Sequence, residues 1–173
     1  MNTAPSPEPL EPDAAPTALA ILRADGSSRL VAQRPLEMGE VVLVLDGVLV
    51  DRPSRHSIQV DVALHLEKPA GVAGVAELDQ CLWRFLEHSC EPNAAFRGRQ
   101  LIATRRIAAF EPVTFDYLTQ EYDMASPFRC QCGSVHCVGE VRGFRHLAGD
   151  ARQRLRPTLA PHILELARRD GLC

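Results

Sequence analysis

Residues 84–93, Arg-Phe-Leu-Glu-His-Ser-Cys-Glu-Pro-Asn, place an imidazole, a hydroxyl, a thiol and an amide within the six positions from His88 to Asn93. Pro92 stiffens the backbone between them, because its ring fixes one of the two free torsion angles. So many polar side chains on one rigid turn are unusual for a segment that only fills a core. We therefore interpret this stretch as part of a functional site, in which the thiol of Cys90 has a specific partner.

A second group of thiols follows at residues 130–137, Cys-Gln-Cys-Gly-Ser-Val-His-Cys, which hold three cysteines in eight positions. A tetrahedral structural zinc site requires four ligands, so this cluster is one ligand short. The first two thiols cannot easily close into a disulfide, because the ring would be too tight, and Gly133 lets the chain turn around a shared ion. The alternative is a set of reduced, buried cysteines without a metal.

Residues 113–117, Val-Thr-Phe-Asp-Tyr, form a short strand-like run that ends in the phenol of Tyr117. A tyrosine after a strand is most often a packing residue. Its position between the two polar motifs makes Tyr117 a candidate catalytic residue instead.

Length and composition limit the class of protein. A chain of 173 residues with 46% hydrophobic residues is most simply one soluble domain. We see no secretory signal and no apolar run of about 20 residues, so we expect a cytoplasmic protein without a membrane partner. The six cysteines then favour metal binding over a disulfide framework. The net charge of −3 gives no basic surplus, so nucleic-acid binding is not indicated.

The local patterns predict a mainly β fold. Residues 1–17 contain five prolines among alanine, serine and acidic residues, which predicts a disordered leader. Apolar positions at helical spacing predict a central helix over residues 76–86 and one or two helices in the arginine-rich tail. Asp46 and Gly47 read as a hairpin turn between two strands. The expected strands are residues 19–23, 29–33, 41–45, 48–50, 57–62, 94–97, 100–104 and 113–116.

The three motifs, in this order, resemble a small single-domain SET-domain protein-lysine methyltransferase with a post-SET-like cysteine tail. The resemblance covers roughly residues 19–143. It implies a β-clip-like fold in which small curled sheets surround a threaded C-terminal segment. The expected organisation is a SET domain over residues 18–126, a zinc-binding post-SET segment over residues 127–143 and an arginine-rich helical tail over residues 144–173.

The resemblance supplies the missing zinc ligand, because Cys90 of the first motif joins the tail thiols in such proteins. The implied ligands are Cys90, Cys130, Cys132 and Cys137. His136 or His88 in place of Cys90 is the competing set.

The resemblance also implies a function, which is methyl transfer from S-adenosylmethionine to a lysine side chain of a protein substrate. Tyr117 would orient the lysine nitrogen at the waist of a channel, and Phe115, on the same side of the strand, would line that channel. The implied cofactor-binding residues are Ser27, Ser28, Arg29, Leu30, Glu87, His88, Tyr117 and Phe128.

The cofactor-side motifs differ from the usual pattern of the family. Ser27-Ser28-Arg29-Leu30 stands where a Gly-x-Gly-Leu is common, and Glu87 stands where an asparagine precedes His-Ser-Cys. These differences, with Leu45 where a tyrosine is common, motivate the alternative of a non-catalytic SET-fold binding module. Methyl transfer to a small amine or another nucleophile is a further alternative that nothing in the sequence decides. For the arginine-rich tail, a solvated helical face and an acidic partner or substrate are both open.

Overall fold

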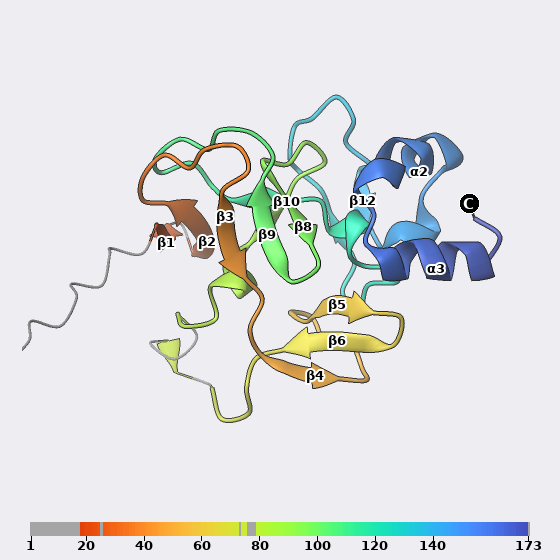
Figure 1. The fold of residues 1–173 in the computed structure, drawn as a ribbon, viewed down its shortest axis with the longest axis horizontal. Helices are drawn as coiled ribbons and strands as arrows, with labels where there is room; N and C mark the ends of the chain where they lie inside the picture. Colours follow the sequence, from red (N-terminus) through yellow and green to blue (C-terminus); the bar gives the residue numbers. More distant parts are fainter. Residues whose placement is uncertain (1–17, 25, 73, 76–78, 173) are drawn as a thin grey trace, which may run out of the picture.

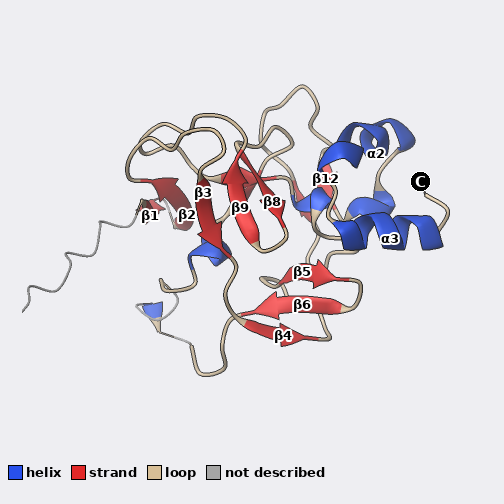
Figure 2. Cartoon of the chain, viewed as in Figure 1, coloured by secondary structure: helices blue, strands red, loops and turns tan. Residues whose placement is uncertain are grey.

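The structure, a computed structural model, describes residues 18–24, 26–72, 74–75 and 79–172. The segment of residues 1–17, with its predicted disorder, lies outside the described residues. In the described part, short strands form small sheets and two α-helices follow at the C-terminal end (Figure 1). The same view coloured by secondary structure shows that strands and loops outweigh helices (Figure 2). The predicted mainly β fold class is confirmed.

Twelve strands are present in the described residues. Their bounds are β1 Leu19–Ala24, β2 Ser27–Ala32, β3 Val41–Val44, β4 Val48–Val50, β5 Ile58–Asp61, β6 Leu64–Glu67, β7 Glu87–His88, β8 Ala94–Arg97, β9 Gln100–Ala103, β10 Thr114–Phe115, β11 Phe128–Arg129 and β12 Glu140–Val141. They pair as β1-β2, β3-β9-β8, β4-β6-β5, β10-β7 and β11-β12. β1-β2 and β8-β9 are antiparallel pairs, each between two strands that the sequence predicts.

The helical elements lie mainly after residue 143. Within the described residues they are the 3₁₀ turns η1 Leu82–Phe85, η2 Tyr117–Thr119, η3 Phe144–His146 and η4 Arg156–Thr158, and the α-helices α2 Gly149–Leu155 and α3 Pro161–Arg169. Among the described helices, none has the length and apolar character that crossing a membrane requires.

The central helix predicted over residues 76–86 is wrong in its described part. Residues 76–78 lie outside the described residues, and Leu82–Phe85 form only a 3₁₀ turn. Cys81, just before that turn, has φ −96° and ψ 62°, which are not helical angles. Trp83 and Leu86 are buried in the larger core, whereas Leu82 and Phe85, which stand at helical spacing, are only partly buried against it, so the burial does not follow the helical spacing.

The hairpin predicted at Asp46 and Gly47 is also wrong. β3 pairs with β9, whereas β4 pairs with β6 in a separate sheet, which lies below the β3-β9-β8 sheet in Figure 1. Gly47 joins the two sheets with φ 154°, and a Cβ there would lie 2.4 Å from the carbonyl oxygen of Glu67. The glycine is therefore required by close backbone approach and not by a two-residue turn.

In the part of the chain that the structure describes, the buried apolar side chains form two clusters. The larger cluster lies among the sheets and includes Leu30, Trp83 and Phe115. The smaller one lies under α2 and α3 and includes Leu118 and Ile163. The ring of Tyr117 packs against both clusters, so the candidate catalytic residue stands where they meet.

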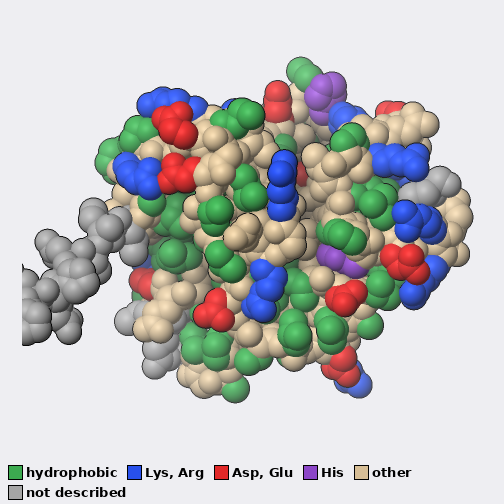
Figure 3. All heavy atoms as spheres, in the orientation of Figure 1, with side chains coloured by type: hydrophobic (Ala, Val, Ile, Leu, Met, Phe, Trp, Pro, Cys, Tyr) green, Lys and Arg blue, Asp and Glu red, His purple; other side chains and the backbone are tan. Residues whose placement is uncertain are grey.

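The surface shown in Figure 3 carries acidic and basic side chains interspersed with one another. This face therefore presents no continuous basic patch, and a basic patch is what a nucleic-acid-binding surface usually shows.

Two turns of the same construction lie side by side, joined by a β-bridge between Leu36 and Ile107. In the first turn the Glu40 carboxylate accepts the backbone N–H of Glu37 at 3.0 Å, and it pairs with an arginine. In the second turn the Glu111 carboxylate does the same with the N–H of Ala108 at 2.8 Å. In each turn, the carboxylate at the end of the turn thus stabilises the turn by accepting a backbone N–H from three residues earlier.

Gly39 and Phe110 occupy the same place in these two turns. Gly39 has φ 88°, and Phe110 has φ 65° although its ring is 75% exposed. Left-handed backbone of this kind costs an ordinary side chain about 1–2 kcal/mol. The second turn therefore holds strain that the first turn avoids.

We expect Phe110→Gly to be more stable than Phe110→Ala by about 1 kcal/mol, because only glycine relieves the left-handed strain. Both variants lose the same exposed ring, so alanine is the matched control. Urea unfolding of the two variants measures the difference. Equal stability, or a more stable alanine variant, would contradict the assignment of strain at this position.

Candidate active site

A parallel pair of two-residue strands brings the polar motifs together. β7 lies beside β10, with Glu87 opposite Thr114 and His88 opposite Phe115. The N–H of Ser89 donates to the carbonyl oxygen of Phe115 at 3.2 Å and extends the contact by one residue. Side chains from residues 84–93 and 113–117 therefore share one small region.

The side chain of Asn93 holds residues 84–93 against residues 113–117. Its side chain is 1% exposed, and its Oδ1 accepts the backbone N–H of Thr114 at 2.9 Å. Its Nδ2 donates to the carbonyl oxygen of Pro112 at 2.8 Å and to Glu111 Oε1 at 3.1 Å. A buried amide left without partners would cost about 1–3 kcal/mol, so these bonds hold the end of the first motif against β10.

His88 is a neutral, oriented imidazole. The backbone N–H of Tyr117 donates to its Nδ1 at 3.2 Å, so the ring proton is on Nε2, which lies 3.3 Å from Cys90 Sγ. Burial lowers the pKa of His88 to about 4. Asp116 Oδ1 lies 3.6 Å from Nδ1, but a neutral ring that accepts at Nδ1 forms no ion pair with it. His88 thus aims an N–H at the sulfur of Cys90.

Asp116 shapes the chain directly after β10. It caps η2 by accepting the N–H of Leu118 at 3.0 Å, and its side chain is buried. Burial raises the pKa of this carboxyl to about 6. The cap makes the chain turn at Tyr117, so the phenol points back toward Leu86 and not along the strand.

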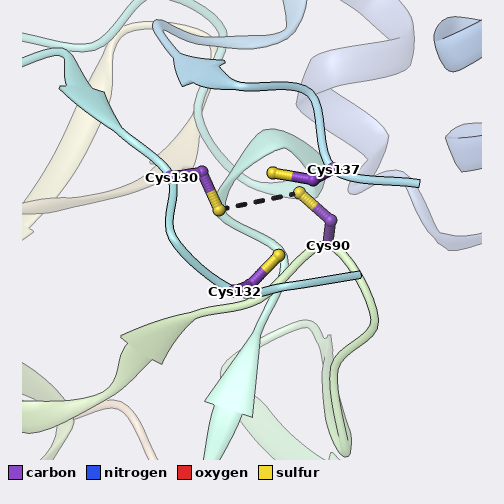
Figure 4. Close-up of side chains that lie close together, drawn as sticks. All are labelled: Cys90, Cys130, Cys132 and Cys137. Carbon is purple, nitrogen blue, oxygen red and sulfur yellow. Dashed lines mark hydrogen bonds between the residues drawn. The ribbon is translucent and has the colours of Figure 1, made fainter. Parts of the chain in front are cut away.

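The four sulfurs of Cys90, Cys130, Cys132 and Cys137 lie within 4.8 Å of one another. Figure 4 shows their side chains pointing inward, with Cys90 from the first motif and the others from the segment after β11. The Cys90 and Cys130 sulfurs are 4.0 Å apart. Ideal tetrahedral zinc with bonds of about 2.3 Å separates its sulfurs by about 3.8 Å, so the donor set and its size fit that metal.

The thiols of this cluster differ in acidity. Burial raises the pKa of Cys90, and it raises that of Cys130 to about 11. Burial opposes ionisation of Cys132 as well, but hydrogen bonds from the backbone N–H groups of Cys90 and Ser134 and from neighbouring thiols lower its pKa to about 7. The cluster therefore already provides backbone donors to a thiolate.

Tyr117 lies between two hollows. The cysteine-side pocket has a volume of about 410 Å³ and is lined by Leu86, Glu87, His88, Tyr117, Phe128, Cys130, Gln131 and Cys132. The tryptophan-side pocket is narrower, at about 70 Å³, and is lined by residues that include Ile58, Trp83, Leu86, Phe115, Tyr117, Glu121 and Met124. Tyr117 and Leu86 are the lining residues common to both.

The Tyr117 hydroxyl is held in place. It donates to the carbonyl oxygen of Leu86 at 2.6 Å, and burial raises the pKa of the phenol above its usual value. The ring of Phe115 lies 4.6 Å from the ring of Tyr117, between centroids. The rings of His88 and Phe128 meet its other side edge-on, at 5.3 and 5.9 Å. The phenol of Tyr117 is therefore neutral, and its ring is surrounded by the rings of Phe115, His88 and Phe128.

Glu121 is an acid that the sequence analysis did not single out. It is 7% exposed, lines the tryptophan-side pocket and accepts the backbone N–H of Gln59 at 2.8 Å. Burial raises the pKa of its carboxyl to about 7. Asn93 and Asp116 lie inside the motifs that the sequence analysis used, so the sequence could point to them. Glu121 lies outside these motifs, and its partner Gln59 on β5 is 62 residues away in the sequence, so no local pattern indicated its role.

The predicted cofactor-binding residues separate into two groups. Glu87, His88, Tyr117 and Phe128 line one pocket together. On β2, Ser27 and Ser28 are exposed, and the side chain of Leu30 is fully buried in the larger core. Arg29 joins the first group through its side chain, because its Nε lies 3.8 Å from Glu87 Oε1.

The family model of the SET domain matches residues 28–118, which is more than half of the chain. A relative named methyltransferase flvH, from Aspergillus flavus, is 30% identical over 86 residues, 47% of each chain. A histone-lysine N-methyltransferase described as H3 lysine-36 specific, from Yarrowia lipolytica, is 30% identical over 131 residues, 66% of this chain and 17% of that protein. The chain thus spans about half of the first relative and a smaller share of the second.

Among solved structures, the chain is similar to KRYPTONITE, whose crystal structure is a complex with mCHG DNA and SAH. The TM-score is 0.50 at 20% identity, over 70% of this chain and 28% of that one. This likeness supports the fold.

We expect Glu121→Gln to stabilise the protein increasingly between about pH 4.5 and pH 8. A carboxyl whose pKa is raised to about 7 by burial is protonated in both states at low pH, and its stabilising contribution is lost as the pH rises through 7. A shift of this size corresponds to about 3 kcal/mol. The amide of glutamine keeps an acceptor for the N–H of Gln59.

Chemical unfolding of the wild type and Glu121→Gln at several pH values measures this difference. Glu40→Gln is the control of opposite sign, because the Arg34 hydrogen bond lowers the pKa of Glu40 and that variant should lose stability above pH 4.5. A Glu121→Gln difference that does not grow with pH would show that the carboxyl ionises without a penalty.

Proposed function

The chain belongs to the SET-domain family, and from that premise we propose that it is an S-adenosylmethionine-dependent methyltransferase that acts on a lysine side chain of a protein. One observation carries the proposal: the Tyr117 hydroxyl stands between a wide pocket on the cysteine side and a narrow pocket on the tryptophan side. A cofactor in the first pocket and a side chain in the second would meet at this hydroxyl.

S-adenosylmethionine, when bound, supplies a methyl group on a positively charged sulfur. The cysteine-side pocket fits such a group in size and in lining, because Phe128 and Tyr117 provide aromatic walls and Glu87 an acid at the edge. Aromatic faces attract a cationic centre. His88, neutral at physiological pH, adds no opposing charge.

The lysine amine must lose its proton before it can attack. Its pKa in water is about 10.4, and transfer into an apolar channel lowers it because the charged form loses hydration. The part of the tryptophan-side pocket formed by the buried side chains of Phe115 and Trp83 is of that kind, whereas Ser54, Arg55 and Glu121 make other parts of its lining polar. An amine that reaches this aromatic part would lose part of its hydration.

Tyr117 orients the amine. Its hydrogen is donated to the Leu86 carbonyl oxygen, so the lone pairs of the phenol oxygen remain free to accept an N–H from the substrate. One N–H held in this way turns the nitrogen lone pair toward the cofactor side. The raised pKa keeps the phenol neutral, so its role is alignment and not proton removal.

We expect Tyr117→Phe to reduce methyl transfer by about 100-fold, since loss of alignment at a reacting atom has costs of that order. The measurement is incorporation of label from S-adenosyl-[methyl-³H]methionine into a lysine-rich protein lysate, with the label located by amino-acid analysis. Tyr122→Phe is the matched control, because it removes the other hydroxyl of this kind, which bonds Asp170 at 2.6 Å outside the site.

The outcomes of this assay separate the candidate functions. Labelling that survives unchanged in Tyr117→Phe would contradict the role of the phenol. Label on residues other than lysine, or on small amines only, would replace the protein-lysine substrate by another nucleophile. No labelling by a wild type that also fails to bind the cofactor would favour a non-catalytic SET-fold module.

We propose that zinc occupies the cluster of Cys90, Cys130, Cys132 and Cys137. The four sulfurs are already close to tetrahedral zinc spacing, and no histidine is part of the group that the described residues form. The N–H of His88 at Cys90 Sγ would stabilise the bound thiolate. The metal would tie the first motif to the tail beside Phe128, and so close one wall of the cysteine-side pocket.

We expect Cys132→Ser to lower bound zinc well below one ion per chain and to lower the melting temperature, because a structural metal contributes folding energy. Metal analysis and thermal unfolding, each before and after treatment with a chelator, measure both effects. Cys81→Ala is the control, since Cys81 is buried in the larger core and lies outside the cluster. A fully loaded and equally stable Cys132→Ser protein would contradict the zinc assignment.

A further inference from the structure

Arg55 stands at the mouth of the tryptophan-side pocket. It is one of the residues that line this pocket, and it is exposed, whereas Glu121 and Phe115 of the same lining are 7% and 3% exposed. This difference places Arg55 at the outer end of the hollow and the other two residues at its inner end. A side chain that enters the pocket therefore passes beside Arg55 before it reaches the aromatic part.

The turn that carries Arg55 is closed by reciprocal hydrogen bonds. The N–H of Ser54 donates to Ser57 Oγ at 2.8 Å, and the N–H of Ser57 donates to Ser54 Oγ at 3.2 Å. The Ser54 hydroxyl donates in turn to the carboxylate of Glu67 on β6. Because the two ends of the turn are bonded to each other and to a strand, the backbone at Arg55 is positioned before any ligand binds.

The positive charge of Arg55 is uncompensated. Within the described residues, its guanidinium makes no hydrogen bond and no ion pair, and the nearby acid Glu67 is already engaged. Glu67 Oε1 accepts Arg84 Nη1 at 3.0 Å and the N–H of Lys68 at 2.9 Å, and Oε2 accepts the Ser54 hydroxyl. Arg84 and Glu67 thus neutralise each other, and the five N–H donors of Arg55 remain unused.

The other ionisable groups of the lining do not offset this charge. Burial, with the neighbouring charges of Arg84 and Arg55, lowers the pKa of His56, so that its ring is neutral at pH 7. Glu121 lies at the inner end, and its carboxylate accepts the N–H of Gln59. The mouth of the pocket therefore carries a net positive charge that a negatively charged ligand group would complement.

We propose that Arg55 selects substrates in which an aspartate or a glutamate lies within two positions of the methylated lysine. This inference rests on the proposed function, since it takes the tryptophan-side pocket as the entry of the lysine side chain. Successive residues of an extended peptide rise by about 3.3 Å, so such an acid lies within about 7 Å of the lysine along the chain. A carboxylate matches a guanidinium because two parallel N–H···O bonds can join them.

The same charge works against basic segments. A substrate lysine arrives as a cation, and a second lysine or an arginine beside it adds a charge that Arg55 repels. An acidic neighbour offsets the repulsion of the lysine itself. Because Arg55 is exposed, the resulting preference is small and is screened by salt.

The test is methylation of a peptide library with one central lysine and randomised residues at the two positions on each side. Sequencing of the methylated peptides by mass spectrometry gives the preference. We expect the wild type to enrich aspartate and glutamate about threefold over asparagine and glutamine, the scale of an exposed ion pair. Arg55→Gln should abolish this enrichment, and Arg55→Glu should replace it by enrichment of lysine and arginine. Neither substitution removes a hydrogen bond or an ion pair that the described residues make with this side chain.

Arg52→Glu is the matched control, because Arg52 is exposed on the same loop but is not a lining residue of the pocket. It should keep the preference of the wild type, and an equal loss of preference in this variant would assign the effect to general surface charge and overturn the inference. A wild type that methylates the library without an acidic preference, or an Arg55→Glu variant that keeps that preference, would also overturn it. In these cases the proposed function survives, since methyl transfer is observed. A wild type that labels neither the library nor the lysate would overturn the proposed function together with the inference.

Discussion

The buried side chain of Asn93 is the interaction on which the rest of the site depends. Its amide is 1% exposed, and both of its polar atoms are bonded to the segment that leads into β10. These bonds, with the two-residue parallel pair β7-β10, set the first motif against residues 113–117. Neither strand is long enough to hold that register alone, so the satisfied buried amide supplies the constraint.

The position of Tyr117 depends on this constraint and on the Asp116 side chain that caps η2. The Asp116 cap turns the chain after β10, and the ring of Tyr117 then lies where the two hydrophobic clusters meet. The C-terminal helices contribute because the N–H of Ala160 bonds the carbonyl oxygen of Thr119 at 2.9 Å, and His162 Nε2 lies 2.9 Å from the Gln120 oxygen. The arginine-rich tail is thus part of the support of the site, with its apolar face buried.

The charges of the site are arranged in a way that suits a cationic methyl donor. Near the Tyr117 hydroxyl, the imidazole of His88 is neutral and the aromatic rings of Phe115 and Phe128 complete the wall. The opposed charges of Arg29 and Glu87 stand farther out, at the rim. Methyl transfer from a sulfonium to an amine develops no negative charge, so the proposed chemistry requires alignment and dehydration more than an anion-binding site.

The sequence alone was sufficient for the features that depend on short-range order. Apolar runs and alternation placed most strands, and the SET fold followed from the resemblance that the ordered motifs carry. The spacing of Cys130, Cys132 and Cys137 indicated a metal cluster, but Cys90 joined it only by resemblance. Local patterns work here because turns and strand periods are set by neighbouring residues.

The tertiary structure decided what depends on contacts between distant segments. Gly47 looked like a hairpin residue, but the pairing of β3 with β9 makes it a crossing point between sheets. The apolar spacing of residues 76–86 predicted a helix, but Leu82–Phe85 form a 3₁₀ turn that buries Trp83 and leaves Leu82 and Phe85 partly exposed, because the surrounding sheets decide which side chains are covered. Burial in the folded chain raises the pKa of Glu121, whose carboxylate accepts the N–H of Gln59 from β5, and Glu87 gains its partner Arg29 from β2, across 58 residues. Burial and charge pairing of this kind arise only when the chain is folded, since they are properties of the space around a residue and not of its neighbours in sequence.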